Sequence, residues 1–395
     1  MVALMATAFC APANATNTLT AQQYWHAKAG LSAMGKLNLL TFGDATLHSD
    51  VEGKVFVGGN LNGNGAPVAI GNGSGKSYTQ DSKYRSLTVG GNATNVQVNN
   101  GIGLSNITAV VGGNATGVQM NNGNATAVLE VAGNVNAQNF NPNSKKTIRY
   151  GGTISGNQTQ DKPYEIHDTT LKAGGAADLK AAITTATNNY VSELTTLSQV
   201  LGALTPTTTL NISNLNAIQF TTPTSTDGGY VVADLTSAQA KALASGTFIL
   251  PTFASSNTLI INVEGAASFT FGANETGNGS AVQQNIIWNF TDATSVTVNT
   301  AVYGSILAPK ATIGGNSPIN GSVVAKVFQS NGEVHLGTFN GNTGFLVAPH
   351  NPGGGGHSQV PGVPEPSSWM TMLAGFGIIG SLIRRQRRRE RLAAA

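Results

Sequence analysis

Side chains that could act as acids, bases, nucleophiles or metal ligands are few in this sequence, and they do not gather. The chain holds one cysteine, Cys10, and no G-x-S-x-G stretch. Its histidines include no pair four residues apart, the spacing that would suit a metal ion on a helix. They are His26, His48, His167, His335, His350 and His357. We therefore predict no catalytic residue, no cofactor and no metal ligand.

The acidic residues offer two further candidates for chemistry. Asp44 and Asp50 lie close together in sequence, where a turn or capping role is favoured over calcium binding. Polysaccharide-cleaving β-helices need several carboxylates beside lysine or arginine in one groove. The repeats described below carry Glu130 as almost their only carboxylate. The sequence thus argues against a lyase and predicts a protein that is not an enzyme.

One stretch imitates a nucleotide-binding loop. The sequence GNGSGKS over Gly71–Ser77 has three residues between its first glycine and the Gly-Lys pair, whereas a P-loop needs four. No helical pattern follows Ser77, so a solvated loop is the favoured interpretation.

The C-terminal residues combine three features that bear on location. Pro364, Glu365 and Pro366 precede an uncharged run over 367–383. A membrane-spanning helix needs about 20 apolar residues, so this run is at the short limit for a transmembrane helix. The arginines that follow would stay on the cytoplasmic side and orient the helix. They include Arg384, Arg385, Arg387, Arg388 and Arg389.

This order of parts, over 363–395, resembles the PEP-CTERM sorting signal of Gram-negative bacteria. The resemblance implies that the inner membrane holds the exported protein transiently, until an exosortase-type membrane processing enzyme removes the tail. Pro364, Glu365 and Pro366 would then form the processing motif. A permanent anchor would use the same helix and arginines but would not need that motif.

The N-terminal residues predict an export signal over 1–15. An apolar stretch runs from Val2 to Phe9, and Ala13 and Ala15 stand in the A-x-A arrangement of a cleavage site. The basic n-region is missing, which suggests a natural start upstream of Met1. A lipoprotein signal at Cys10 is disfavoured because Phe9 is bulky, so the mature chain would contain no cysteine.

The composition describes a polar domain with little charge. Charged residues make up 10% of the chain, which contains 49 glycines, whereas average domains are about 25% charged. The net charge of +3 comes from the tail, because residues 384–391 carry +5 and the remainder −2. There is therefore no basic surface for nucleic acid.

Repeats in the first half predict a β-solenoid. GGNATNVQVNNG begins at Gly90 and GGNATGVQMNNG at Gly112, and looser copies bring the successive steps to 32, 22, 20 and 19 residues. Each unit opens with alternating apolar residues, the mark of a strand. The Gly-Gly-Asn that follows would turn the chain, because glycine reaches positive φ. A series of β-hairpins is the alternative, since Asn-Gly also makes hairpin turns.

Stacked coils would place one asparagine from each repeat in a column, at the core or at a corner. These are Asn60, Asn92, Asn114 and Asn134. Side-chain amides in such a column can form a ladder of hydrogen bonds.

A helix is predicted at about 171–202. Its apolar residues recur every three or four positions from Leu179 to Leu201, and Gly202 and Pro206 end the pattern. We expect this helix to pack on the flank of the solenoid. Strands resume after Pro206, and a Pro/Gly-rich linker occupies 349–362.

The region from Leu37 to Phe345 resembles the choice-of-anchor A family. LNLLTFGDATLHSDVEGKVFVGGNL near the start, the GGN repeats, the central helix and YGSILAPKATI near the end carry the resemblance. It implies a secreted, adhesive β-helical domain over 16–348, and it supplies no catalytic residues. The region is also similar to ice-binding proteins that pair a β-helix with a long helix.

The sequence predicts a mainly β fold: a parallel β-helix with one long flanking α-helix, plus the C-terminal transmembrane helix. The favoured function is an exported, biofilm-associated adhesin of the cell surface or extracellular matrix. Its partner would be an extracellular polysaccharide or a matrix protein, and not nucleic acid. Ice binding, polysaccharide binding and a lyase stay as alternatives. Ice binding is ranked lower because Thr88, Thr94, Thr108 and Thr116 fall at uneven offsets.

Overall fold

The structure, a computed structural model, describes residues 19–71, 85–99, 106–121, 126–136, 139–140, 146–156 and 164–349. The predicted signal peptide, the sorting tail over 363–395 and nearly all of the linker lie outside these residues, as does most of the GNGSGKS loop. The predicted transmembrane segment over 367–383 is part of that tail. Among the helices of the described ranges, none combines the length and the apolar character needed to cross a membrane.

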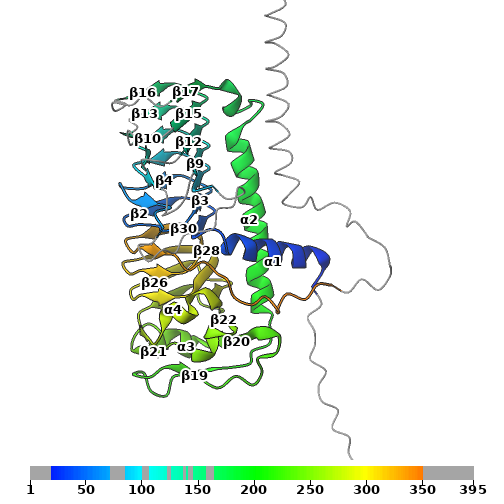
Figure 1. Cartoon of the computed structure of the whole chain (residues 1–395). Coiled ribbons are helices and arrows are strands. Elements are labelled where there is room, and N and C mark those ends of the chain that lie inside the picture. The colour runs from blue at the N-terminus through cyan, green and yellow to red at the C-terminus, as the bar shows by residue number, and fades with distance from the viewer. Residues whose placement is uncertain are drawn as a thin grey trace, which may run out of the picture.

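Short strands stack side by side in three columns around a common axis, and almost all of them pair in parallel (Figure 1). The single antiparallel pair among the described residues joins β18 (Leu210–Asn211) and β19 (Gln219–Phe220). Hairpins would pair neighbouring strands in antiparallel, so the parallel pairing confirms the predicted solenoid.

We call the first column the helix face, because both long helices cover it. From the upper end in Figure 1 to the lower end it contains β17 (Tyr164–His167), β15 (Lys146–Tyr150), β12 (Thr126–Val131), β9 (Asn106–Val111), β6 (Leu87–Val89), β3 (Val55–Val57), β1 (Leu39–Thr41), β30 (Val323–Ser330), β28 (Ser305–Gly315), β25 (Ile286–Phe290), β22 (Thr258–Val263) and β20 (Tyr230–Leu235).

The second column, the open face, follows the helix face around each coil. It contains β16 (Ile154–Ser155), β13 (Val135–Asn136), β10 (Ala115–Thr116), β7 (Ala93–Thr94), β4 (Leu61–Asn62), β2 (Ala45–Leu47), the later parts of β30 and β28, β26 (Ser295–Val298) and β23 (Ser268–Phe271).

The third face closes the coils. It contains β14 (Asn139–Phe140), β11 (Gln119–Met120), β8 (Gln97–Val98), β5 (Pro67–Val68), the bridging residue Val51, β31 (Val334–His335), β29 (Ile319–Asn320) and β27 (Val302–Tyr303).

Short strands, short helices and 3-10 turns cover the lower end of the solenoid or lie in the connections between its strands. Besides β18 and β19 they are β21 (Thr247–Ile249), β24 (Asn274–Thr276), α3 (Ser237–Ala242), α4 (Gly279–Val282) and the 3-10 turns η1 (Thr169–Leu171), η2 (Asp227–Gly229), η3 (Thr252–Ser255) and η4 (Gln283–Asn285).

The order of coils in space differs from their order in sequence. Strand β1 lies in the middle of the solenoid, where it pairs with β3 on one side and with β30 on the other. The first half of the chain runs from β1 in the middle of the solenoid to β17 at its upper end. Helix α2 then returns the chain to the lower end, and the second half runs upward from β20 to β30. The first and last coils therefore meet at a seam that the sequence pattern did not predict.

The core follows from the alternation of side chains along the strands. Leu39, Val55 and Val57 point into the solenoid, where they join a fully buried apolar cluster that runs through both halves. Their neighbours Leu40 and Phe56 point outward and join a second cluster beneath the helices. The strands of the helix face thus carry apolar side chains both toward the core and toward the helices, as expected for a parallel sheet that is covered on both faces.

The long flanking helix is α2 (Leu179–Gly202). It begins eight residues after the predicted start at 171, because Asp178 caps it by accepting hydrogen bonds from the N–H groups of Ala181 and Gly174. Ile183, Leu194, Leu197 and Leu201 are buried against the helix face, which confirms the predicted packing.

The C-terminal turn of α2 is held by a buried polar ladder. The amide of Asn289 donates to the carbonyl of Ser198 at 2.9 Å, and the amide of Asn262 donates to that of Leu201 at 3.0 Å. The two asparagines also bond to each other at 2.8 Å. The last four carbonyls of a helix lack partners within it, so the bond from Asn262 satisfies the carbonyl of Leu201 at the end of α2.

The paired glycines explain how α2 comes so close. In Gly58-Gly59, Gly90-Gly91 and Gly112-Gly113 none of the glycines has positive φ, so the predicted reason for glycine was wrong. The constraint is space. A Cβ at Gly58, Gly90 or Gly112 would lie 2.3, 2.2 or 2.5 Å from a carbonyl oxygen of the preceding coil. The same Cβ atoms would also lie 2.6 Å from Thr187, 3.3 Å from Ile183 and 3.2 Å from Lys180 of α2.

The second glycine of each pair makes room for a side-chain oxygen of the preceding coil, which belongs to Asp44 at Gly59 and to an asparagine at Gly91 and Gly113. The side-chain carbonyl of Asn92 accepts the N–H of Asn114 at 2.8 Å, and that of Asn114 accepts the N–H of Asn134 at 2.8 Å. The predicted column therefore exists, at an exposed corner. Its bonds run from side chain to backbone and not from amide to amide.

A second helix, α1 (Ala21–Met34), was not predicted. Its signal is the capping box formed by Thr20 and Gln23, a pattern that sequence inspection could have found. The helix crosses α2 (Figure 1). The two approach closely at Gly30, where a Cβ would lie 3.1 Å from the carbonyl oxygen of Glu193.

We expect Gly113→Ala to destabilise the fold by about 1–3 kcal/mol. The new Cβ would lie 2.5 Å from the side-chain oxygen of Asn92, which must then release the N–H of Asn114. Ala132→Gly is the matched control, because it changes the same pair of residue types at a corner that already holds alanine, and should cost about 0.5–1 kcal/mol. Chemical denaturation measures both, and equal stabilities would contradict the steric explanation.

Glu275 predicts a pH dependence of stability. Burial raises the pKa of this carboxyl to about 8, although the N–H of Tyr303 at 2.9 Å opposes the shift. The folded protein therefore keeps a proton that the unfolded chain loses above pH 4.5. Its contribution to the free energy of unfolding should fall as pH rises from about 4.5 to 8, by up to about 1.4 kcal/mol per unit. Glu275→Gln should remove this slope in denaturation curves at several pH values; identical slopes would show that Glu275 does not cause it.

Candidate binding face

The outward side chains of the open face form one row of small, uncharged residues. Strand pairing places them in register from the upper end to the lower end, across the seam. The row comprises Ser155, Asn136, Thr116, Thr94, Asn62, Thr46, Gln329, Gly314, Thr297 and Thr270. All are exposed or partly exposed. In Figure 1 this face lies on the side of the solenoid away from both helices.

A second row runs beside the first, at the corner that precedes it. In the upper half this row is the asparagine column. It begins at Asp44, before Asn60, and ends at Thr153, after Asn134. Asp44 accepts the N–H of Asn60 at 2.7 Å and so acts as the first rung. This is the capping role favoured for Asp44. Asp50 lies elsewhere, beside Val51 on the third face.

The uneven spacing of the threonines in sequence, which ranked ice binding lower, does not reflect their arrangement in space. Thr94 and Thr116 are paired neighbours on the open face. Thr88 and Thr108 belong to strands of the helix face. The offsets are uneven because the sequence interleaves two faces, and the threonines of the open face are in register.

A charged cluster marks the seam on the third face. Val51 bridges Val68 on one side and Val334 on the other. Asp50 and Glu52 flank Val51, and Glu333 and His335 flank Val334. His335 contacts Glu333 at 2.6 Å and Asn320 at 3.0 Å, and Glu52 accepts the N–H of Leu336 at 2.5 Å.

Two carboxyls of this seam cluster, Asp50 and Glu52, have raised pKa values. Burial raises the pKa of Asp50, and the nearby charge of Glu333 raises it further. Burial also raises the pKa of Glu52, against the hydrogen bond from Leu336. Within the described ranges, no three His, Cys, Asp or Glu residues are placed so that they could hold a metal ion.

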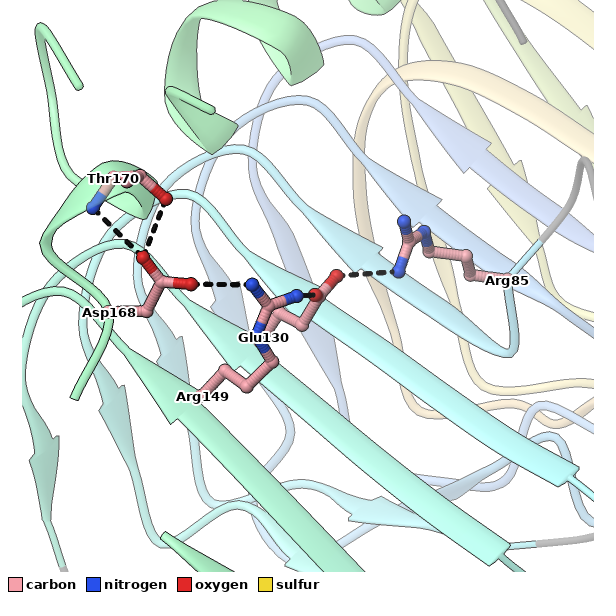
Figure 2. A network of polar contacts seen from close by, with 5 residues as sticks. All are labelled: Arg85, Glu130, Arg149, Asp168 and Thr170. Atoms are coloured by element: carbon pink, nitrogen blue, oxygen red, sulfur yellow. Dashed lines mark hydrogen bonds and ion pairs between the residues drawn. The ribbon is translucent and has the colours of Figure 1, made fainter. Parts of the chain in front are cut away.

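An ion-pair network lies at the upper end of the helix face (Figure 2). Glu130 on β12 contacts Arg85 at 3.0 Å and Arg149 on β15 at 2.6 Å. Arg149 also contacts Asp168 at 2.5 Å, and Asp168 accepts two hydrogen bonds from Thr170 in η1. The network ties three coils to the segment that leads into α2.

This network has the residue types of a lyase groove but not a free base. Glu130 faces two guanidinium groups. Burial alone would raise the pKa of Asp168, but the hydrogen bonds from Thr170 and Arg149 outweigh it and lower the pKa. A carboxylate held in this way is a poor proton acceptor near neutral pH.

The remaining sequence candidates lie apart from one another. His26 is on α1, His48 follows β2, and His167 stacks on Tyr150 with ring centroids 5.3 Å apart. Pro364, Glu365, Pro366 and the arginines of the tail lie outside the described residues, with His350 and His357.

Sequence reasoning missed the network and the seam cluster for one reason. Residues 85, 130, 149 and 168 come from different coils, and 50 and 333 come from opposite ends of the domain. Only strand register brings them together. For the network, the repeat spacing of about twenty residues was a usable signal, since Glu130 and Arg149 are paired in neighbouring coils.

Comparison with known proteins gives two family matches. The family described as "Putative Ice-binding-like adhesive domain" matches residues 30–336, and the PEP-CTERM protein-sorting motif matches residues 362–389. The motif marks an exported protein that an exosortase processes at the membrane on its way to the cell surface.

Two solved structures are similar to the chain, and no curated protein matches it. One is an ice-binding protein from the Antarctic ascomycete Antarctomyces psychrotrophicus, with 14% identity and a TM-score of 0.28. The other is an ice-binding protein from an Antarctic Flavobacteriaceae bacterium, with 13% identity and a TM-score of 0.25. Each similarity covers 78% of this chain and 98% of the other. Because the adhesive-domain match spans most of the sequence, the chain belongs to the ice-binding-like adhesive domain family and carries a PEP-CTERM sorting motif.

Proposed function

We propose that the protein is a non-enzymatic surface adhesin whose open face binds a neutral, repetitive extracellular polymer such as a matrix polysaccharide. The observation that carries this proposal is the uncharged row of ten rungs, of which nine carry a hydroxyl or amide side chain and one is Gly314. The family match supports adhesion, and so does the resemblance of Leu37–Phe345 to the choice-of-anchor A family.

The geometry of the row favours an extended target. Neighbouring strands are about 4.8 Å apart, so the row of ten rungs, nine of them with a polar side chain, extends over roughly 43 Å. A hydrogen bond exchanged with water contributes only about 0.5–1.5 kcal/mol net. Useful affinity therefore requires many rungs at once, which a repeating polymer can supply and a small molecule cannot.

The absence of charge on the row selects against other partners. A polyanion such as nucleic acid or an acidic polysaccharide is bound largely through lysine and arginine, and the row contains neither. The lyase alternative is disfavoured because Glu130 and Asp168 are engaged in ion pairs.

Ice binding is a second candidate, favoured by the register of Thr94 and Thr116 on a regular face. Ice is also an uncharged, repetitive target. The two candidates use the same face, so the same variants test both.

We expect the double variant Thr94→Glu/Thr116→Glu to lower binding to neutral polysaccharide at least about tenfold, because two adjacent rungs become charged and hydrated. A glycan array and immobilised matrix polysaccharide measure this. Thr185→Glu, on the exposed side of α2, is the matched control and should bind normally. Inhibition of ice recrystallisation by the natural protein, without polysaccharide binding, would select the second candidate. Binding that survives the double variant would remove the open face from either role.

Processing of the sorting tail can be tested directly. If processing at Pro364, Glu365 and Pro366 releases the domain, mass spectrometry of the extracellular fraction should find no peptides beyond Trp369. Glu365→Ala should leave the precursor in the membrane, whereas Glu390→Ala, in the same tail but outside the motif, should be released normally. Tail peptides in the extracellular fraction, or normal release of Glu365→Ala, would contradict cleavage.

A further inference from the structure

The outer side of α1 carries an exposed aromatic pair with a cation. Trp25 is 41% exposed, whereas Trp288 is fully buried in the solenoid. Tyr24 packs edge-on against Trp25 at 5.1 Å, and the Lys28 ammonium lies 5.0 Å from the Trp25 ring centroid. Neither the solenoid nor the open face needs these side chains. They also precede the matched adhesive domain, which starts at residue 30.

Both ends of the described domain lie on the helix side of the molecule. Leu19, before α1, and Leu346, near the last described residue, pack against the same apolar cluster beneath the helices. Val347 follows and is 68% exposed. From residue 349 to the start of the sorting motif at 362 there are thirteen residues, which reach at most about 45 Å when fully extended. A tail held in the membrane therefore keeps the end of the domain that lies on this side within about 45 Å of the lipid surface.

The charge of this region suits an anionic surface. Residues 19–43 contain no aspartate or glutamate, and they include Lys28 and Lys36. Tryptophan and tyrosine favour the interface between water and lipid, and lysine can extend its ammonium to the headgroups. Juxtamembrane lysines are attracted to anionic lipids.

We propose that the outer side of α1, with Tyr24, Trp25 and Lys28, rests on the anionic lipid interface while the sorting tail holds the precursor in the membrane. The open face, on the side away from the helices, then points away from the lipid (Figure 1). Contact with lipid orients the domain before release and is lost when the tail is removed.

The test uses the full chain reconstituted in phosphatidylethanolamine–phosphatidylglycerol vesicles that contain brominated lipid. Trp369→Phe removes the tryptophan of the tail and leaves Trp25 and the buried Trp288. We expect its fluorescence to be quenched at least about twofold more than that of Trp25→Phe/Trp369→Phe, which reports Trp288 alone. The single variant Trp25→Phe keeps Trp369 and the buried Trp288, so the quenching of its fluorescence shows whether the tail is inserted.

A charge reversal provides the second arm. Lys28→Glu in the Trp369→Phe background should lower the quenching of Trp25, with the melting temperature unchanged. Lys241→Glu, on α3 at the lower end of the solenoid, is the matched control and should leave quenching unchanged. Equal quenching with and without Trp25, or quenching indifferent to Lys28→Glu, would overturn the proposal while the tail remains inserted. A tail that does not insert would overturn it as well. Binding by the open face is measured separately and does not depend on either result.

Discussion

The close stacking of the glycine corners on one another and against α2 is the constraint on which the rest of the structure depends. An α-helix rises about 1.5 Å per residue and stacked strands lie about 4.8 Å apart, so three or four helical residues match one coil. The contacts follow this match: Lys180, Ile183 and Thr187 meet the corners of three successive coils at Gly112, Gly90 and Gly58. Side chains at these corners would push the helix away, and the outward apolar residues of the helix face would lose their cover.

Because α2 returns the chain along the whole solenoid, the domain can be built from two halves that meet at a seam. Each face joins the halves by different chemistry. On the helix face Leu40 pairs with Val324 beneath the helices, and on the open face Thr46 pairs with Gln329. On the third face Val51 bridges Val334, and the pKa values of Asp50 and Glu52, on either side of Val51, are raised. The row of the open face thus crosses the seam without a charged residue, and the carboxylate of Asp44 lies at the corner beside it.

The helix face and the open face differ in what their side chains contact. The ion-pair network of Glu130 and Arg149, the asparagines at the end of α2 and the two termini of the described domain lie on the helix face or at its edge, where they hold α2 in place. The open face carries none of these duties. Its short side chains are not needed for packing, which leaves them available for a binding partner, and the tether lies on the other side of the solenoid.

The sequence by itself determined the parallel solenoid, the flanking helix, the asparagine column and the sorting tail, because each is written as a local pattern: a period near twenty residues, an apolar stripe, an ordered triplet of features. It also suggested the wrong reason for the paired glycines, since the steric demands of the stacked coil and of α2 are invisible in the repeat. Tertiary structure alone decided that β1 lies beside β30 and that Thr94 and Thr116 share a face apart from Thr88 and Thr108. It likewise decided that Glu130 is held between Arg85 and Arg149. These relations depend on strand register between coils that are distant in sequence, and register is set by how the whole solenoid packs.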